Sequence, residues 1–193
     1  MITLDDISLL IACHEPTLIP PDARTASAVA LVLREEQGEV HVLFVERATR
    51  PGDPWSGDIG FPGGKVEAED EGPQQAAERE TREEIGLDLR TGRFLGRLSD
   101  ITGAHLPVLV SCFIYAVSTT EPFTLSDELS DAFWVPLAEL QAPERHIVSP
   151  VLFRGETMDR PAIALPVSGK PLLWGITYRL VMEFLRLAGG GER

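Results

Sequence analysis

The chain has 193 residues, of which 44% are hydrophobic and 24% are charged, and its formal net charge is −13. These proportions are ordinary for a soluble globular protein, and the length suits a single domain with a substantial core. The acidic balance argues against a nonspecific nucleic-acid binder, which needs a basic surface to displace counterions. It does not exclude an anionic substrate, because bound cations invert the local field.

The sequence predicts a cytoplasmic protein with no membrane partner. Residues 1–16 lack the basic n-region of a secretory signal peptide, and no run approaches the ~18 apolar residues of a membrane span. Cys13 and Cys112 lie in apolar surroundings, and two isolated cysteines do not make a disulfide framework. Both are therefore interpreted as buried thiols in a reducing compartment.

The first third of the chain is expected to form a helix, a linker and a hairpin. Three prolines between Pro16 and Pro21 end the helix, and Gly38 marks the turn between two apolar runs. In order, the predicted elements are a helix over 4–13, a linker to residue 24, strands over 26–34 and 40–47, and a loop rich in Gly, Pro and Asp over 48–60.

The stretch 61–87, FPGGKVEAEDEGPQQAAERETREEIGL, carries most of the chemistry. It opens with a Pro-Gly-Gly turn, passes through an acidic loop and continues into a predicted helix over 73–85. Pro73 at the start and Gly86 just past the end are the expected signals of the two helix ends.

Three carboxylates share one face of this helix. Glu80, Glu83 and Glu84 are spaced three and four apart, so at about 100° per residue they project together. A hard divalent cation turns their repulsion into binding, because it prefers oxygen ligands. The glycines of the turn let backbone carbonyls approach the same ion, and Arg79 can fix the Glu83 rotamer at i,i+4. The alternative is a solvated Glu-rich face.

Beyond this stretch the pattern predicts the rest of a mixed sheet and a closing helix. The run 108–117 is the most hydrophobic strand and is expected to be central. The other predicted elements are strands over 94–99, 132–135 and 162–165, a helical turn over 136–140, an irregular segment over 144–160, a helix over 172–187 and a frayed tail over 188–193. Strands on both sides of a central helix fit an α/β fold with a mixed sheet between helices.

The stretch 61–87 resembles the Nudix box, G-x5-E-x7-R-E-U-x-E-E-x-G-U, in which U is aliphatic. The residues that match are Gly64, Arg79, Glu80, Glu83, Glu84, Gly86 and Leu87. Asp70 replaces the early Glu, one extra residue precedes the Arg, and Thr81 replaces an aliphatic residue; the coenzyme A pyrophosphatase branch of the family shares the first two departures and tolerates the third. The resemblance implies that residues 1–193 form a single Nudix hydrolase domain, an α/β/α sandwich with a mixed β-sheet.

An element before the box resembles part of that branch's pattern L-L-T-x-R-[SA]-x3-R-x3-G-x3-F-P-G-G. Leu43, Arg47 and Ala48 fall on pattern positions, but the second Arg is absent from its place and Arg50 is out of register. Arg47 and Arg50 are candidates to clamp a phosphate, since Arg binds phosphate bidentately; the alternative is a surface charge. The segment 174–177, which also resembles the branch, is interpreted as helix packing.

Metal-dependent hydrolysis of a P–O–P bond in a nucleoside diphosphate linked to a group X follows from these residues and the resemblance. From the resemblance, X is phosphopantetheine, so that coenzyme A or an acyl-CoA yields 3′,5′-ADP and a 4′-phosphopantetheine. The candidate metal ligands for Mg²⁺ or Mn²⁺ are Glu80, Glu83, Glu84 and the Gly64 carbonyl; the candidate catalytic residues are Glu80 as base, Arg79 and Glu128; and the candidate substrate-binding residues are Arg47, Arg50, Gly63 and Gly64.

Three alternatives stay open. The first is a Nudix hydrolase of nucleotide sugars, dinucleoside polyphosphates or oxidised nucleoside triphosphates. The second is a catalytically idle module that senses a nucleotide, and the third is an acidic calcium-binding or adaptor domain, although EF-hand spacing is absent from the sequence. The expected partner is a small-molecule nucleotide, and an apolar patch on the N-terminal helix would favour a homodimer.

Overall fold

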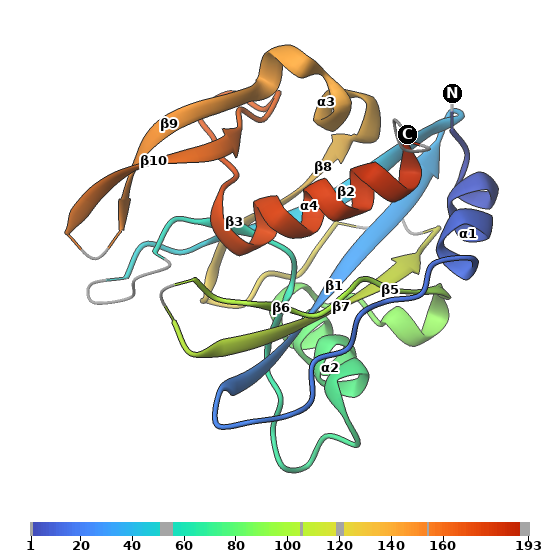
Figure 1. The fold of residues 1–193 in the computed structure, drawn as a ribbon. Coiled ribbons are helices and arrows are strands. Elements are labelled where there is room, and N and C mark those ends of the chain that lie inside the picture. The colour runs from blue at the N-terminus through green and yellow to red at the C-terminus, as the bar shows by residue number, and fades with distance from the viewer. Residues whose placement is uncertain (1, 51–55, 105, 119–121, 154, 190–193) are drawn as a thin grey trace.

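The computed structural model describes residues 2–50, 56–104, 106–118, 122–153 and 155–189. In these residues eight strands form one mixed sheet, in which the order of the main path is β3-β2-β1-β7-β5 (Figure 1). Most of the tail predicted over 188–193 lies outside the described residues, as do the positions where the second Arg of the upstream pattern was sought.

The predicted hairpin and the predicted central strand organise this sheet. β1 (Thr25–Glu36) and β2 (Glu39–Arg47) pair antiparallel around the turn at Gly38. β7 (Val108–Ala116) pairs with β1 in parallel and lies inside the sheet, as its unbroken apolar run predicts. The remaining strands of this sheet are β3 (Ile59–Gly60), β4 (Gly63–Lys65), β5 (Arg93–Arg97), β6 (Ile101–Thr102) and β8 (Leu129–Pro136).

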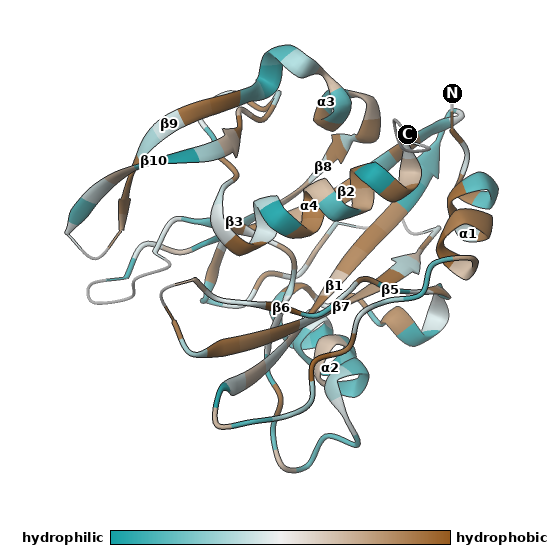
Figure 2. Cartoon of the chain, in the orientation of Figure 1, coloured by the Kyte–Doolittle hydropathy of each residue, from teal (hydrophilic) through white to brown (hydrophobic). Residues whose placement is uncertain are grey.

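Alternate residues of the central strands enter two separate cores. On β1, Leu31 and Leu33 pack in the core that also contains α1 (Leu4–Ala12) and α4 (Gly175–Ala188). Val32 and the alanines of the same strand pack instead against α2 (Pro73–Ile85). Figure 1 shows α4 and α2 on opposite faces of the sheet, and Figure 2 shows hydrophobic residues concentrated along the central strands. The described residues therefore form the predicted α/β/α sandwich with a mixed sheet.

The helix of the central motif has the bounds that the sequence predicts. α2 runs from Pro73 to Ile85, and Gly86 ends it in the left-handed region at φ +75°. Thr81, which stands where the family pattern has an aliphatic residue, is fully buried and its hydroxyl donates to the Ala77 carbonyl at 2.6 Å. The hydroxyl is thus satisfied within the helix, which explains why Thr is tolerated on the face that packs against the sheet.

The segment 144–160, expected to be irregular, is instead most of a β-hairpin. β9 (His146–Phe153) and β10 (Glu156–Ile163) pair antiparallel as a separate two-stranded sheet beside the start of α4 (Figure 1). Pro150 and Pro161 argue against strands in the sequence, but each lies in a ribbon whose outer edges pair with no third strand of the described residues, where the missing N–H costs little. The strand expected over 162–165 is the end of β10.

Smaller corrections concern the first cysteine and several boundaries. Cys112 is buried as predicted, but Cys13 is exposed, because it follows the last residue of α1 rather than facing the core. The short strand β3 lies in the expected loop over 48–60, and β6 lies between the strands expected over 94–99 and 108–117. α4 begins at Gly175, three residues later than predicted. The helical turn after β8 is α3 (Leu137–Gln141), and 3₁₀ turns span Leu89–Thr91 and Pro143–Arg145.

The packing of α1 on β5 gives a stability prediction. Gly96 has φ +143°, and a Cβ there would lie 2.5 Å from Ile11 Cγ2 of α1. Gly96→Ala should therefore lower the free energy of unfolding by about 2–4 kcal/mol, through backbone strain and overpacking. Urea unfolding monitored by circular dichroism measures the loss.

Gly169→Ala is the matched control, because Gly169 has φ +79° with nothing within 4 Å of the added Cβ. It should cost only about 1 kcal/mol. Equal losses for the two variants would show that the contact with α1 does not limit the fold.

Candidate active site

The Gly63-Gly64 turn lies against β1, the middle strand of the main path of the sheet. β4 pairs antiparallel with β1, with Gly63 opposite Val29 and Gly64 opposite Ala28. Gly63 has φ +150°, and a Cβ at this position would collide with the Ala28 carbonyl oxygen. Only glycine fits this conformation and this close approach. The turn therefore lies flat against β1, and the Gly63 N–H points toward α2, where it meets Glu84.

The carboxylate of Glu80 fills the space that a side chain at Gly64 would need. A Cβ built on Gly64 would overlap the carboxylate carbon and both of its oxygens. Glu80 is half-buried, and burial raises its pKa, while the adjacent Arg79 guanidinium lowers it. The close fit places the Glu80 carboxylate directly against the backbone of the turn.

Glu84 is the most deeply buried carboxylate of α2. The residue is 6% exposed, and its Oε2 accepts a hydrogen bond from the Gly63 N–H at 2.9 Å. Burial raises the pKa of Glu84 to about 7; the Gly63 hydrogen bond opposes this shift, the Glu80 charge adds to it, and the charges of Arg47 and Glu128 act in opposite directions. The structure thus brings Glu80, Glu84, Glu128 and Arg47 within electrostatic reach of one another.

Arg79 holds the acidic groups around it in place. Its guanidinium donates to both oxygens of Asp70, each at 3.0 Å, to Glu80 Oε1 at 2.9 Å and to Glu83 Oε2 at 3.2 Å. The hydrogen bonds between Arg79 and Asp70 are the chief cause of two pKa shifts: they raise the pKa of Arg79 and lower the pKa of Asp70. The Asp70 that departs from the family pattern therefore still pairs with the Arg of the motif.

The carboxylates of α2 do not converge as a ready-made triad. Among the described residues no three His, Cys, Asp or Glu side chains are grouped closely enough to hold a metal ion. Glu83 is 59% exposed and bonded to Arg79, whereas Glu84 is turned toward the Gly63 N–H. The donor set nevertheless fits a divalent cation, because the desolvated carboxylates of Glu80 and Glu84 both lie against the Gly63-Gly64 turn and supply oxygen ligands.

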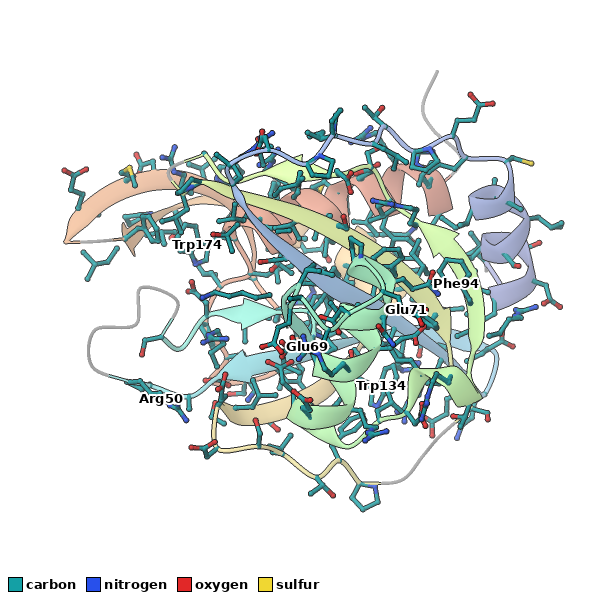
Figure 3. All side chains as sticks on the ribbon, turned by 90° about the horizontal axis from the view of Figure 1, so that it is seen from below. Arg50, Glu69, Glu71, Phe94, Trp134 and Trp174 are labelled. Carbon is teal, nitrogen blue, oxygen red and sulfur yellow. The ribbon has the colours of Figure 1, made fainter. Side chains whose placement is uncertain are left out.

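A cavity of about 230 Å³ opens beside the turn. Among its lining residues are Arg47, Gly63 and Gly64, so the structure places these three predicted substrate-binding residues together. Arg50 is elsewhere: its guanidinium donates to the Asp127 carbonyl and carboxylate at 2.8 and 2.9 Å, and Figure 3 shows its side chain at the periphery of the molecule. Arg50 thus fixes the loop that precedes Glu128 rather than lining the cavity.

Residues near the C-terminus complete this cavity, and the sequence reasoning missed them. Trp174, Ile176 and Thr177 line it, and the Trp174 indole N–H donates to Asp58 Oδ1 at 3.0 Å. This segment was interpreted as helix packing, and it does begin α4. The signal that could have found it was its resemblance to the coenzyme A branch, since nothing in its own composition distinguishes a cavity wall from a core.

The comparisons with known proteins identify the class. The NUDIX domain model matches residues 24–154, so the chain belongs to the Nudix family, and the predicted family of pyrophosphohydrolases is confirmed. Among its relatives, the mitochondrial coenzyme A diphosphatase NUDT8 of Homo sapiens is 30% identical over 173 residues, which cover 88% of this chain and 72% of that protein.

Two further comparisons bear on extent and fold. The uncharacterized protein C14C4.10c of Schizosaccharomyces pombe is 32% identical over 154 residues, 68% of this chain but 47% of that protein, so the matching region spans less than half of its length. The solved structure of a MutT/nudix family protein from Enterococcus faecalis has a TM-score of 0.59 at 16% identity and covers 97% of this chain and 70% of that one. At this identity the likeness shows the fold alone.

The burial of Glu84 gives a prediction about stability and pH. Its pKa in the folded protein, about 7, lies above the ordinary value of 4.5. In EDTA, the unfolded chain therefore loses its proton first as pH rises, and the free energy of unfolding should fall by up to about 3 kcal/mol between pH 4.5 and 7 and then level off. Glu84→Gln should lack this fall and be the more stable protein at pH 8.

Urea unfolding at a series of pH values measures the effect. Glu83→Gln is the matched control on the same helix and, being exposed, should keep the wild-type profile. Adding Mg²⁺ at pH 8 should stabilise the wild type more than Glu84→Gln. Parallel profiles for wild type and Glu84→Gln in EDTA would contradict the assignment of a desolvated carboxylate.

Proposed function

We propose that this Nudix protein hydrolyses the diphosphate bond of coenzyme A or an acyl-CoA to 3′,5′-ADP and a 4′-phosphopantetheine. The observation that carries the hydrolytic site is the contact between the Gly63-Gly64 turn and the desolvated carboxylates of Glu80 and Glu84, beside the cavity that Arg47 lines. The similarity to a relative named as a coenzyme A diphosphatase supports the choice of substrate.

The proposed cation is Mg²⁺ or Mn²⁺, held by Glu80, Glu83, Glu84 and the Gly64 carbonyl. A cation there supplies neutralisation of the diphosphate charge and a more acidic water. To join this ligand set, Glu83 would exchange its hydrogen bond to Arg79 for the cation, and because Glu83 is exposed, the loss of that bond would cost little.

The side chains divide the remaining work. Glu80 is the proposed base that takes the proton from the attacking water, and Arg79 is a positioning residue that holds its carboxylate. Arg47, which lines the cavity, is the proposed residue that binds a phosphate oxygen. Glu128, whose charge acts on Glu84, is the proposed further carboxylate, while Arg50 acts on it indirectly through Asp127.

Three further properties are proposed for this protein: its cellular location, its oligomeric state and the extent of its domain. No helix in the described part of the chain combines the length and the apolar character needed to cross a membrane. Cytoplasmic location stays a prediction, as does a single Nudix hydrolase domain over residues 1–193. The homodimer also stays a prediction, supported by Leu9 and Leu10 of α1, which are 69% and 38% exposed.

The substrate proposal predicts a ranking of activities. With Mg²⁺ or Mn²⁺, kcat/KM for release of 3′,5′-ADP from coenzyme A should exceed that for nucleotide sugars, dinucleoside polyphosphates and 8-oxo-dGTP by at least about 10-fold, the effect of one well-placed contact. Chromatographic product analysis over this panel measures the ranking. A higher kcat/KM for any other member would end the coenzyme A assignment and leave the Nudix chemistry intact.

The carboxylate assignments predict losses of turnover. Glu80→Gln and Glu84→Gln should each reduce kcat on the best substrate at least ~10²-fold, as expected for the loss of a base or a metal ligand. Glu69→Gln, on the exposed acidic loop, is the control and should keep wild-type turnover. Near-wild-type kcat in both helix variants, with folding checked by circular dichroism, would place the site elsewhere.

A further inference from the structure

A second and larger cavity adjoins the candidate active site. It has a volume of about 480 Å³, within the range of roughly 300–1,000 Å³ that small-molecule sites occupy. Its walls come from the segment between β6 and β7, from the β9–β10 hairpin and from the first turns of α4. Trp174, Gly175 and Ile176 line both cavities, so a ligand that spans them passes over the start of α4.

The wall is mostly apolar and contains three aromatic residues. Phe153, Trp174 and Tyr178 line the cavity, and the Phe153 and Trp174 rings meet edge to face with centroids 5.7 Å apart. The hydrogen bond from the Trp174 indole to Asp58 helps to hold the ring in this orientation. Held rings of this kind are suited to stack on a flat heterocycle at little entropic cost.

Two guanidinium groups border the same space. Arg160 of β10 and Arg179 of α4 line it, and no Asp or Glu is among the described residues that do. Arg179 Nη1 donates to the Thr102 carbonyl at 2.6 Å, which anchors that side chain at the cavity. In a chain with 30 acidic and 17 basic residues, this local excess of positive charge favours an anionic ligand group.

We propose that this aromatic cavity binds the nucleoside half of the substrate, a purine nucleoside whose ribose carries a phosphate monoester. The base stacks on Trp174, and the monoester is held by Arg160 and Arg179. This inference rests on the proposed function, since the 5′-diphosphate must then reach the neighbouring cavity between Arg47 and the Gly63-Gly64 turn.

The other half of the proposed substrate suits the aromatic cavity less well. A pantetheine arm carries two amides and an alcohol that need hydrogen-bond partners, which a mostly apolar wall does not offer. An aliphatic acyl chain would need no such partners, but it would make no use of the positive charge of Arg160 and Arg179. A phosphate monoester matches both guanidinium groups with charge-assisted hydrogen bonds.

Calorimetric titration tests the inference without turnover. In EDTA, the wild-type protein should bind 3′,5′-ADP at least ~10-fold more tightly than 5′-AMP, which lacks the second monoester. Arg160→Met and Arg179→Met should each reduce this affinity ratio toward one. Trp174→Ala should lower the affinities for both ligands by a similar factor and leave their ratio unchanged, because Trp174 stacks on the base, which the two ligands share.

Arg186→Met is the matched control, since Arg186 is an exposed arginine of the same helix and lines neither cavity. It should keep both affinities, and thermal unfolding of each variant checks the fold. Equal binding of 3′,5′-ADP and 5′-AMP by the wild type, or a ratio unchanged in both cavity variants, would overturn the assignment. So would binding of 4′-phosphopantetheine that depends on Trp174 while binding of 3′,5′-ADP does not.

The outcomes for the two proposals separate. Hydrolysis of coenzyme A without any preference for 3′,5′-ADP would sustain the proposed function and overturn the cavity assignment. An arginine-dependent preference for 3′,5′-ADP in a protein that leaves coenzyme A intact would sustain the assignment and overturn the proposed function.

Discussion

The contact between a glycine turn and two carboxylates is the constraint on which the rest of the site depends. Gly63 and Gly64 lie against β1, and Glu80 and Glu84 reach them from α2, so the helix must lie close to the sheet. The buried cluster between them includes small side chains on both elements, the alanines of β1 and Ala76 and Ala77 of α2, beside larger ones such as Leu43 and Phe113. Larger residues in this layer would lift the helix and separate the carboxylates from the turn.

Holding these carboxylates together out of solvent is electrostatically unfavourable. Burial raises the pKa of both Glu80 and Glu84, and neighbouring carboxylates raise it further: Glu83 acts on Glu80, and Glu80 acts on Glu84. Arg79 offsets only part of this, because its bonds go to Asp70, Glu80 and Glu83, whereas Glu84 is held by the Gly63 N–H. Carboxylates whose pKa is raised by burial are characteristic of functional sites. A divalent cation would relieve the repulsion that the fold imposes.

The sequence predicted what local chemistry and periodicity determine. The bounds of α2 follow from Pro73 and Gly86, and β1 and β7 follow from apolar runs, which in β7 are rich in β-branched and aromatic residues. The carboxylate face followed from helical spacing. The β9–β10 hairpin was missed because Pro150 and Pro161 contradict strand signals, and because a two-stranded ribbon has no deeply buried face to impose alternation.

The cavities themselves depend on tertiary packing, which no local pattern encodes. Trp174 acquires its role from Asp58, 116 positions earlier in the chain, and from Phe153 on the hairpin. Likewise, Arg50 pairs with Asp127 and does not line the cavity that Arg47 lines, although the two arginines are close in sequence. Proximity in sequence to a motif was therefore a poor guide to membership of the site.

The two cavities also differ in their relation to the family domain. The glycine turn, α2 and Arg47 all lie within residues 24–154, which match the NUDIX model, whereas Arg160, Trp174 and Arg179 follow that region. The two arginines proposed to hold the monoester thus lie outside the matched region, although Phe153 of the same cavity lies inside it and Trp174 lines both cavities. Substitutions on β10 and α4 can therefore alter which nucleotide is held while the glycine turn and α2 keep their geometry.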